Sequence, residues 1–70
     1  NGGKEGLSFY RTIVSQASFY LEKGGWLLLE VGQGQGSKVS EWIEEEGNFL
    51  KPQLLQDLSR IGRVVKAQRK

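Results

Sequence analysis

The sequence lacks cysteine, histidine and methionine, and it holds one proline, Pro52. Without cysteine and histidine it can form no disulfide bond, no ordinary zinc site and no Ser-His or Cys-His catalytic pair. No apolar run approaches the ~18 residues of a membrane-spanning helix and no signal peptide is recognisable, so we expect no membrane partner. Ten basic and eight acidic side chains leave a net charge of +2, which by itself indicates no acidic partner.

The length of 70 residues fits one very small domain or half of an ordinary one. A chain of this size buries only ~60% of the surface that its unfolded form exposes, and small domains usually need a disulfide or a metal as a further constraint. Because an open reading frame begins with methionine and none is present, we expect residues 1–70 to be a single partial domain, a fragment of a larger protein.

The first half of the chain predicts a helix followed by a strand. Apolar residues recur every three or four positions from Leu7 to Leu21, which is typical of a helix with one buried face, and we place this helix at residues 7–22. Two glycines then end it. Residues 26–31 are almost continuously apolar, which is typical of a strand that is covered on both faces in a parallel sheet.

The second half predicts a helix and two strands. The helix spans residues 37–46 and Ser37 can cap it. Its inward residues are Val39, Trp42 and Ile43. Strands follow at residues 49–58 and 63–68, separated by a short turn that favours antiparallel pairing. Since proline cannot donate to a strand ladder, Pro52 places the first of these strands at an edge.

This order of elements predicts part of an α/β sheet. The strand at residues 26–31 requires a parallel neighbour and a helix on each face, and the two helices can supply that cover. No segment of the sequence supplies a second parallel strand. We therefore interpret the chain as one half of a doubly wound α/β fold, whose free strand edge would invite self-association with a second copy.

The glycine-rich residues 30–36, EVGQGQG, form the most distinctive motif. Glycines between a strand and a helix let the backbone approach a ligand, and the helix N-terminus attracts negative charge, so the pattern is compatible with a nucleotide or cofactor cradle. A dinucleotide site also requires an acidic residue about 20 positions later, and residues 51–55 contain none. A structural turn is the alternative interpretation.

Three longer segments carry a family resemblance. Residues 2–13, GGKEGLSFYRTI, look like Gly-x-Asp-Gly-Leu-x-x-Tyr-Arg-x-Ile. Residues 21–32, LEKGGWLLLEVG, look like Leu-Lys-Pro-Gly-Gly-x-Leu-x-x-Glu-x-Gly, and a Gln-Gly pair follows at Gln35 and Gly36. Residues 57–67, DLSRIGRVVKA, look like Asp-Leu-x-Gly-x-x-Arg-x-x-x-Ala. In this order the motifs resemble the HemK-type family, protein-glutamine N5-methyltransferases that modify peptide chain release factors.

The sequence departs from the family pattern at three positions. Glu5 replaces an aspartate, Lys23 replaces the proline before the paired glycines, and Arg60 replaces a glycine, with a glycine displaced to Gly62.

The resemblance implies the C-terminal half of a Rossmann-like class I methyltransferase fold, with residues 63–68 inserted antiparallel beside the edge strand. The larger protein would transfer a methyl group from S-adenosylmethionine to the glutamine of a Gly-Gly-Gln motif in a release factor, in the cytoplasm or an organelle. The family's first cofactor motif and its catalytic Asn-Pro-Pro-Tyr lie upstream. No catalytic or cofactor-binding residue can therefore be assigned here, and the fragment alone is expected to be inactive and to bind no cofactor.

Within the resemblance, residues 32–36 are the turn after the fifth strand, near the substrate side of the cleft. The residues that this implies for a substrate-cleft rim are Glu30, Gly32, Gln33 and Gly34. A carboxylate such as that of Glu30, at the end of a strand expected to be buried, also requires a partner.

Two other function classes stay open. One is a small stand-alone cofactor-binding module built on residues 32–36. The other is a nucleic-acid-binding module that uses the last eleven residues, which hold five basic and no acidic side chains. Since these residues contain no aromatic side chain for base stacking, a solvated tail is the favoured interpretation. The glutamates at positions 41 and 44–46 are interpreted as a solvated helix face and not as a metal site.

Overall fold

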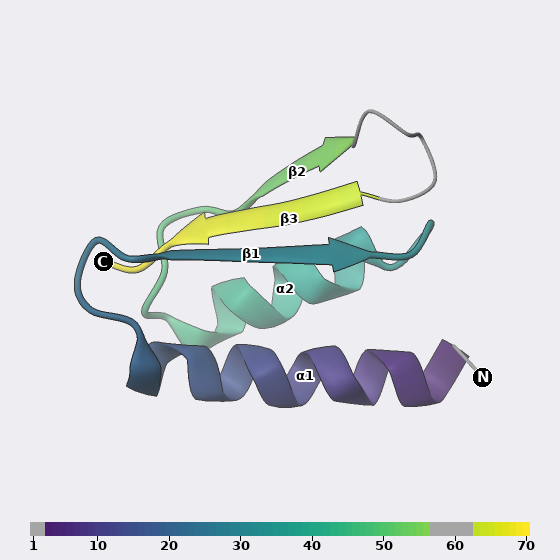
Figure 1. Ribbon diagram of the computed structural model, residues 1–70, viewed down its shortest axis with the longest axis horizontal. Helices are drawn as coiled ribbons and strands as arrows, with labels where there is room; N and C mark the ends of the chain where they lie inside the picture. Colours follow the sequence, from purple (N-terminus) through teal and green to yellow (C-terminus); the bar gives the residue numbers. More distant parts are fainter. Residues whose placement is uncertain (1–2, 57–62) are drawn as a thin grey trace.

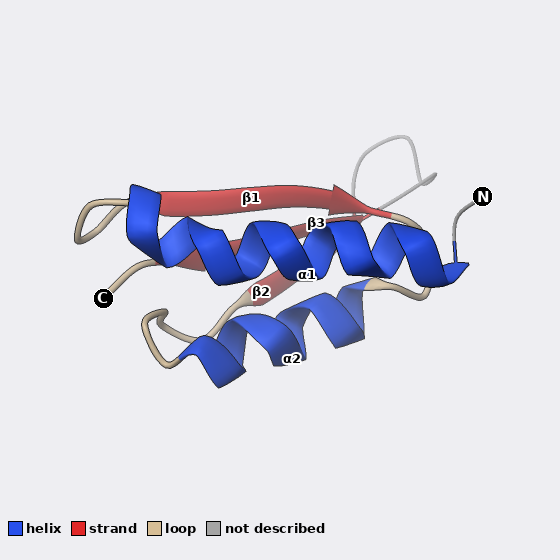
Figure 2. Cartoon of the chain, turned by 90° about the horizontal axis from the view of Figure 1, so that it is seen from below, coloured by secondary structure: helices blue, strands red, loops and turns tan. Residues whose placement is uncertain are grey.

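The fold has two layers, a three-stranded sheet and two helices that lie side by side beneath it (Figures 1 and 2). The computed structural model describes residues 3–56 and 63–70. In chain order the elements are α1 (Gly3–Tyr20), β1 (Trp26–Val31), α2 (Gly36–Glu46), β2 (Gln53–Gln56) and β3 (Arg63–Gln68). Both β1 and β3 have the bounds that the sequence predicts.

The sheet has the order β1-β3-β2, with β3 antiparallel to both neighbours. The register sets Leu29 opposite Val65, and Val65 opposite Leu54. The predicted antiparallel pairing of the last two strands is therefore confirmed, and β2, which follows Pro52, lies at the edge as predicted. Because β1 and β2 both oppose β3, they run parallel to each other, and α2 connects them across the inserted strand. The expectation that no parallel neighbour is supplied for β1 holds within the described residues, because the antiparallel β3 lies between β1 and β2.

The prediction that β1 is covered on both faces is wrong for the described residues. Both helices pack on the same face of the sheet, so neither remains to cover the other face (Figure 1). Exposure accordingly alternates along β1, with Trp26 and Leu28 48% and 59% exposed and Val31 2% exposed. Alternation of this kind is typical of an antiparallel sheet with one open face. We call the uncovered side of the sheet the outer face.

The hydrophobic core lies between the sheet and the two helices. Its buried members are Val14, Ala17, Val31, Val39, Ile43, Phe49, Val65 and Ala67. Val39 and Ile43 are fully buried, as predicted for the inward side of α2. Trp42, the third residue predicted to face inward, is only half-buried and packs against the rim of the core.

Each helix differs from its predicted bounds at one or both ends. α1 begins at Gly3 and ends at Tyr20, where residues 7–22 were expected, because apolar periodicity marks the buried part of a helix and not its polar first turn. At the other end, the Gly25 amide donates to the Glu22 carbonyl and Gly24 adopts a φ of +82°, which turns the chain toward β1.

The N-terminus of α2 is not capped by Ser37. The cap position is Gln35, which makes no side-chain cap hydrogen bond, and the amide of Val39 donates to its carbonyl at 3.2 Å. The helical ladder therefore begins earlier than the serine suggests, with Gly36 as its first residue and Ser37 inside the helix. At the other end Gly47 closes α2 in the left-handed region, with a φ of +77°, as its glycine predicts.

The strand predicted at residues 49–58 is shorter, because β2 spans only Gln53–Gln56. Phe49 forms an isolated antiparallel bridge with Arg69, and Pro52, which has no amide hydrogen, lies between this bridge and β2. The last two residues of the predicted strand, and the predicted turn after them, lie outside the described residues.

Candidate functional site

The turn between β1 and α2 holds the glycine-rich motif, and its hydrogen bonds are internal. The amide of Gly32 donates to the side-chain Oε1 of Gln35 at 2.9 Å, and the amide of Gln35 donates back to the Gly32 carbonyl at 3.1 Å. Gly34 lies between them with a φ of +84°, a conformation that favours glycine. Two of the amides that could cradle an anion are thus already engaged, so the arrangement does not fit a phosphate or cofactor cradle.

The glycines of this turn serve different purposes. A Cβ on Gly34 would meet no atom within 4 Å, so this glycine is required by its backbone conformation and not by space. A Cβ on Gly36 would come within 2.5 Å of Leu54 Cδ1, so the first turn of α2 packs directly on β2. The last glycine of the motif is therefore explained by helix–strand packing.

Glu30 projects from β1 on the outer face and is exposed. The expectation that its carboxylate is buried and needs a partner is wrong for the described residues, because the strand is open on that face and the side chain is exposed. Its main-chain carbonyl is held instead, since the Tyr10 hydroxyl donates to this oxygen at 2.7 Å. A contact from α1 thereby fixes the end of β1 that leads into the turn.

The four predicted rim residues lie together at the C-terminal end of β1, and the side of the turn that they form is exposed. The C-terminal end of β2 and the N-terminus of α2 point to the same end of the molecule, as does the N-terminus of α1 (Figure 1). In open α/β sheets, ligands bind beyond the carboxyl ends of the strands. The position suits a binding role. No two described side chains at this end contact each other as a pair of catalytic groups would.

Sequence reasoning missed two residues of this region, Tyr10 and Gln35. The sequence indicates Tyr10 only as part of the motif at residues 2–13, yet its hydroxyl donates to the carbonyl of a strand residue twenty positions later in the chain. Gln35 was noted only for a motif match, yet both its side chain and its main chain close the turn. The sequence signal for this role is a glutamine three positions after the glycine that follows the strand.

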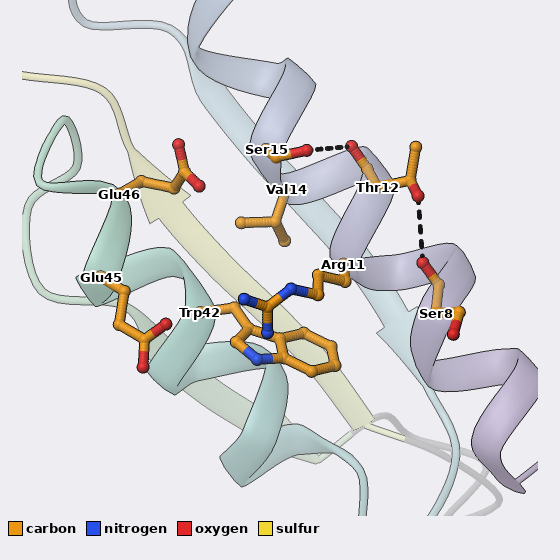
Figure 3. A pocket seen from close by; sticks show the side chains of 8 residues that line it. All are labelled: Ser8, Arg11, Thr12, Val14, Ser15, Trp42, Glu45 and Glu46. Carbon is orange, nitrogen blue, oxygen red and sulfur yellow. Dashed lines mark hydrogen bonds between the residues drawn. The ribbon is translucent and has the colours of Figure 1, made fainter.

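A separate groove of about 390 Å³ lies between α1 and α2 (Figure 3). Its main contact is the Arg11 guanidinium, which stacks over the Trp42 ring at 5.1 Å from the ring centroid. The hydroxyls on its α1 side bond to their own helix, Thr12 to the Ser8 carbonyl and Ser15 to the Thr12 carbonyl. None of the predicted rim residues lines this groove.

Two basic side chains near the C-terminus make separate contacts. Lys66 lies over the Trp26 ring at 4.7 Å on the outer face, whereas Arg69 donates through Nε to the Ser18 carbonyl at 3.1 Å. Among the side chains that the structure describes, those of residues 7–56 and 63–70, no three acidic groups are placed to hold a metal ion. Neither of the described helices offers an apolar stretch that could span a bilayer.

Comparison with known proteins finds similarity to bacterial release factor glutamine methyltransferases. The enzyme of Clostridium acetobutylicum is 40% identical over 68 residues, and that of Thermodesulfovibrio yellowstonii is 39% identical over 69 residues, which are 97% and 99% of this chain. The Geobacter sulfurreducens enzyme is 45% identical over 65 residues. These matches confirm the resemblance that the motifs predict.

The chain spans only about a quarter of the length of these relatives, 24% of the first two and 22% of the third. No protein-family model matches the chain. No solved structure matches it either.

Proposed function

We propose that this chain is the C-terminal part of a Rossmann-like class I methyltransferase domain. The complete protein would transfer a methyl group from S-adenosylmethionine to the side-chain amide nitrogen of the glutamine in the Gly-Gly-Gln motif of a peptide chain release factor. The observation that carries the proposal is the similarity, over nearly the whole chain, to proteins named release factor glutamine methyltransferases. Since release factors act on ribosomes, the reaction is assigned to a compartment that holds them, the cytoplasm or an organelle.

The sheet topology supports this assignment. The resemblance implies a sheet that ends in a strand, an antiparallel inserted strand and an edge strand. The observed order β1-β3-β2, with β3 antiparallel to both neighbours, has this arrangement. Helical cover on a single face of β1 also suits a part of a larger sheet, because the outer face still exposes Trp26, Leu28 and Leu55.

The role proposed for these residues is structural support and one rim of the substrate cleft. Glu30, Gly32, Gln33 and Gly34 form that rim, at the end of the sheet where α/β folds bind ligands. S-adenosylmethionine supplies the electrophilic methyl group when it is bound to the complete protein. No residue of this chain is proposed to hold S-adenosylmethionine, because the amides of Gly32 and Gln35 already donate hydrogen bonds within the turn.

An amide nitrogen is a weak nucleophile, so the reaction depends on holding it in line with the methyl group. A rim can contribute by fixing the backbone of the substrate loop. The hydrogen bonds within the turn and the Tyr10 contact to Glu30 hold this rim in one geometry before substrate binds.

The proposal is tested by incubating the complete protein with S-adenosylmethionine and a release factor, and by locating the added methyl group with peptide mass spectrometry. Methylation of the Gly-Gly-Gln glutamine is expected, with none on a release factor whose glutamine is replaced by asparagine. The chain of 70 residues alone should transfer no methyl group. Methylation of a different residue, or of nucleic acid, would contradict the proposal.

A separate substitution tests the assignment of the rim residues. Gln33→Ala in the complete protein should raise the KM for the release factor while the affinity for S-adenosylmethionine stays unchanged. Gln53→Ala is the matched control, because Gln53 is also exposed but lies at the start of β2. Equal effects of the two substitutions would refute the rim.

A further inference from the structure

The groove between α1 and α2 is separate from the rim and has no part in the function proposed above. It opens on the side of the helix layer that faces away from the sheet, with the strands behind it (Figure 3). The buried side chain of Val14 lies at its floor, and the half-buried Trp42 forms part of its wall. Its volume of about 390 Å³ is large enough to receive a side chain of another molecule.

The position of the groove agrees with the larger sheet to which the chain is assigned. α2 packs against β2 and β3, whereas α1 bonds to β1 through the Tyr10 hydroxyl. A sheet that continues past β1 therefore adds its further elements beside β1 and beside the flank of α1 that faces away from α2. The groove lies on the opposite flank of α1, between the two helices.

The wall that α2 supplies is negatively charged. Glu45 and Glu46 line the groove in the last turn of α2, where the helix dipole disfavours carboxylates and where no basic residue offsets them. The ion pair that the structure describes on α2 joins Lys38 to Glu41 at 3.4 Å and involves neither of these glutamates. Residues that disfavour their own local structure are expected where they serve a function.

The Trp42 ring shows which cation this groove can receive. The Arg11 guanidinium already lies over the ring, at 5.1 Å from its centroid, so the ring face accepts a planar cation. Arg11 is exposed, and a cation–π contact at an exposed site is weak, so a guanidinium of another molecule can take its place. That guanidinium would share the groove with the carboxylates of Glu45 and Glu46, and arginine pairs with carboxylates through two parallel hydrogen bonds.

We propose that the groove binds an arginine side chain of the release factor, at a second contact apart from the Gly-Gly-Gln loop. The proposal rests on the function proposed above. Release factors act on ribosomes, and surfaces that face polyanionic RNA carry basic side chains, which complement the charge of the α2 wall. At a helical rise of about 1.5 Å per residue, Gly36 and Glu45 lie about 14 Å apart along α2, so one substrate surface can reach both the rim and the groove.

The test compares two substrates of the complete protein, a folded release factor and a short peptide that carries only the Gly-Gly-Gln motif. Glu45→Lys should raise the KM for the release factor at least about fivefold and leave the KM for the peptide unchanged, because only the folded factor reaches the groove. Glu44→Lys is the matched control, since Glu44 is exposed in the same turn but does not line the groove, and it should change either KM less than about twofold.

Arg11→Ala should act in the opposite direction. It removes the cation that competes for the Trp42 ring, so the KM for the release factor should fall. Added salt gives a further readout, because screening should raise the KM for the release factor more in the wild-type protein than in the Glu45→Lys variant. The affinity for S-adenosylmethionine should be the same in all of these proteins.

The outcomes separate this proposal from the one on which it rests. A wild-type protein that methylates no release factor would refute the proposed function and, with it, the partner named here. Methylation by the wild type, with equal effects of Glu45→Lys and Glu44→Lys on the KM for the release factor, would overturn the groove contact alone. A KM that rises equally for the peptide, or one that rises in the Arg11→Ala variant, would also overturn it.

Discussion

The hydroxyl of Tyr10 in α1 donates a hydrogen bond of 2.7 Å to the main-chain carbonyl oxygen of Glu30 near the end of β1. The bond joins the helix layer to the sheet at the point where the chain enters the glycine-rich turn. One side chain thus links the packing of α1 to the position of the candidate rim.

Tyr10→Phe should lower the free energy of unfolding by about 1 kcal/mol, because it removes one hydrogen bond while keeping the ring. Tyr20→Phe is the control, since the Tyr20 side chain is 79% exposed, and it should change the stability little. Urea unfolding of both variants at one protein concentration measures the difference. Equal stabilities for the two variants would show that the Tyr10 contact contributes nothing in solution.

Gln35→Ala should loosen the turn without disturbing the core. The substitution removes the acceptor of the Gly32 amide, and the expected loss of stability is about 1 kcal/mol. The specific readout is hydrogen exchange of the Gly32 amide, which should become faster while the amide of the core residue Val65 stays protected. Gln33→Ala should leave the Gly32 amide unchanged. An unchanged exchange rate in the Gln35 variant would disprove the internal hydrogen bond.

Gly36→Ala tests the contact between α2 and β2. The added methyl group would meet Leu54 Cδ1 at 2.5 Å, and overpacking of this kind costs about 1–3 kcal/mol, against a gain of about 1 kcal/mol in helix propensity. A net destabilisation is therefore expected in the wild-type background. In a Leu54→Ala background the clash is absent, so the same substitution should stabilise. A thermal unfolding cycle of the four proteins measures the sign, and the same sign in both backgrounds would rule out the contact.

Ile43→Ala should destabilise the chain by about 2–5 kcal/mol, because Ile43 is fully buried between the helices and the sheet. Leu50→Ala removes a side chain that is 50% exposed and should cost much less. Since a small domain has only a few kcal/mol of stability, the first variant is expected to be largely unfolded by circular dichroism. A folded Ile43 variant would contradict the described core.

The sequence predicted the elements whose signals are local. The apolar run at residues 26–31 and the short apolar segment at residues 63–68 have the bounds of β1 and β3. The single proline placed β2 at the edge, because a missing amide hydrogen excludes a central strand position. These predictions succeeded since each rests on one physical property of one short segment.

The predictions that failed concern relations between segments. Continuous apolarity in β1 indicated cover on both faces, yet it cannot say which face each helix occupies, and both occupy one. Ser37 has the chemistry of a helix cap, yet packing of Gly36 against Leu54 and the turn closed by Gln35 start α2 earlier. The Tyr10 contact to Glu30 depends on how α1 lies against β1, which no spacing along the chain encodes.

The most direct test of the account is a calorimetric titration of S-adenosylmethionine into two samples. One is the 70-residue chain, shown to be folded by circular dichroism, and the other is the complete protein to which the chain is assigned. We expect binding by the complete protein and none by the 70-residue chain, because the amides of Gly32 and Gln35 are already bonded within the turn. Binding by the 70-residue chain would make residues 32–36 a cofactor cradle and would contradict the proposal that the cofactor site lies outside this chain. Absence of binding by both samples would contradict the methyltransferase assignment itself.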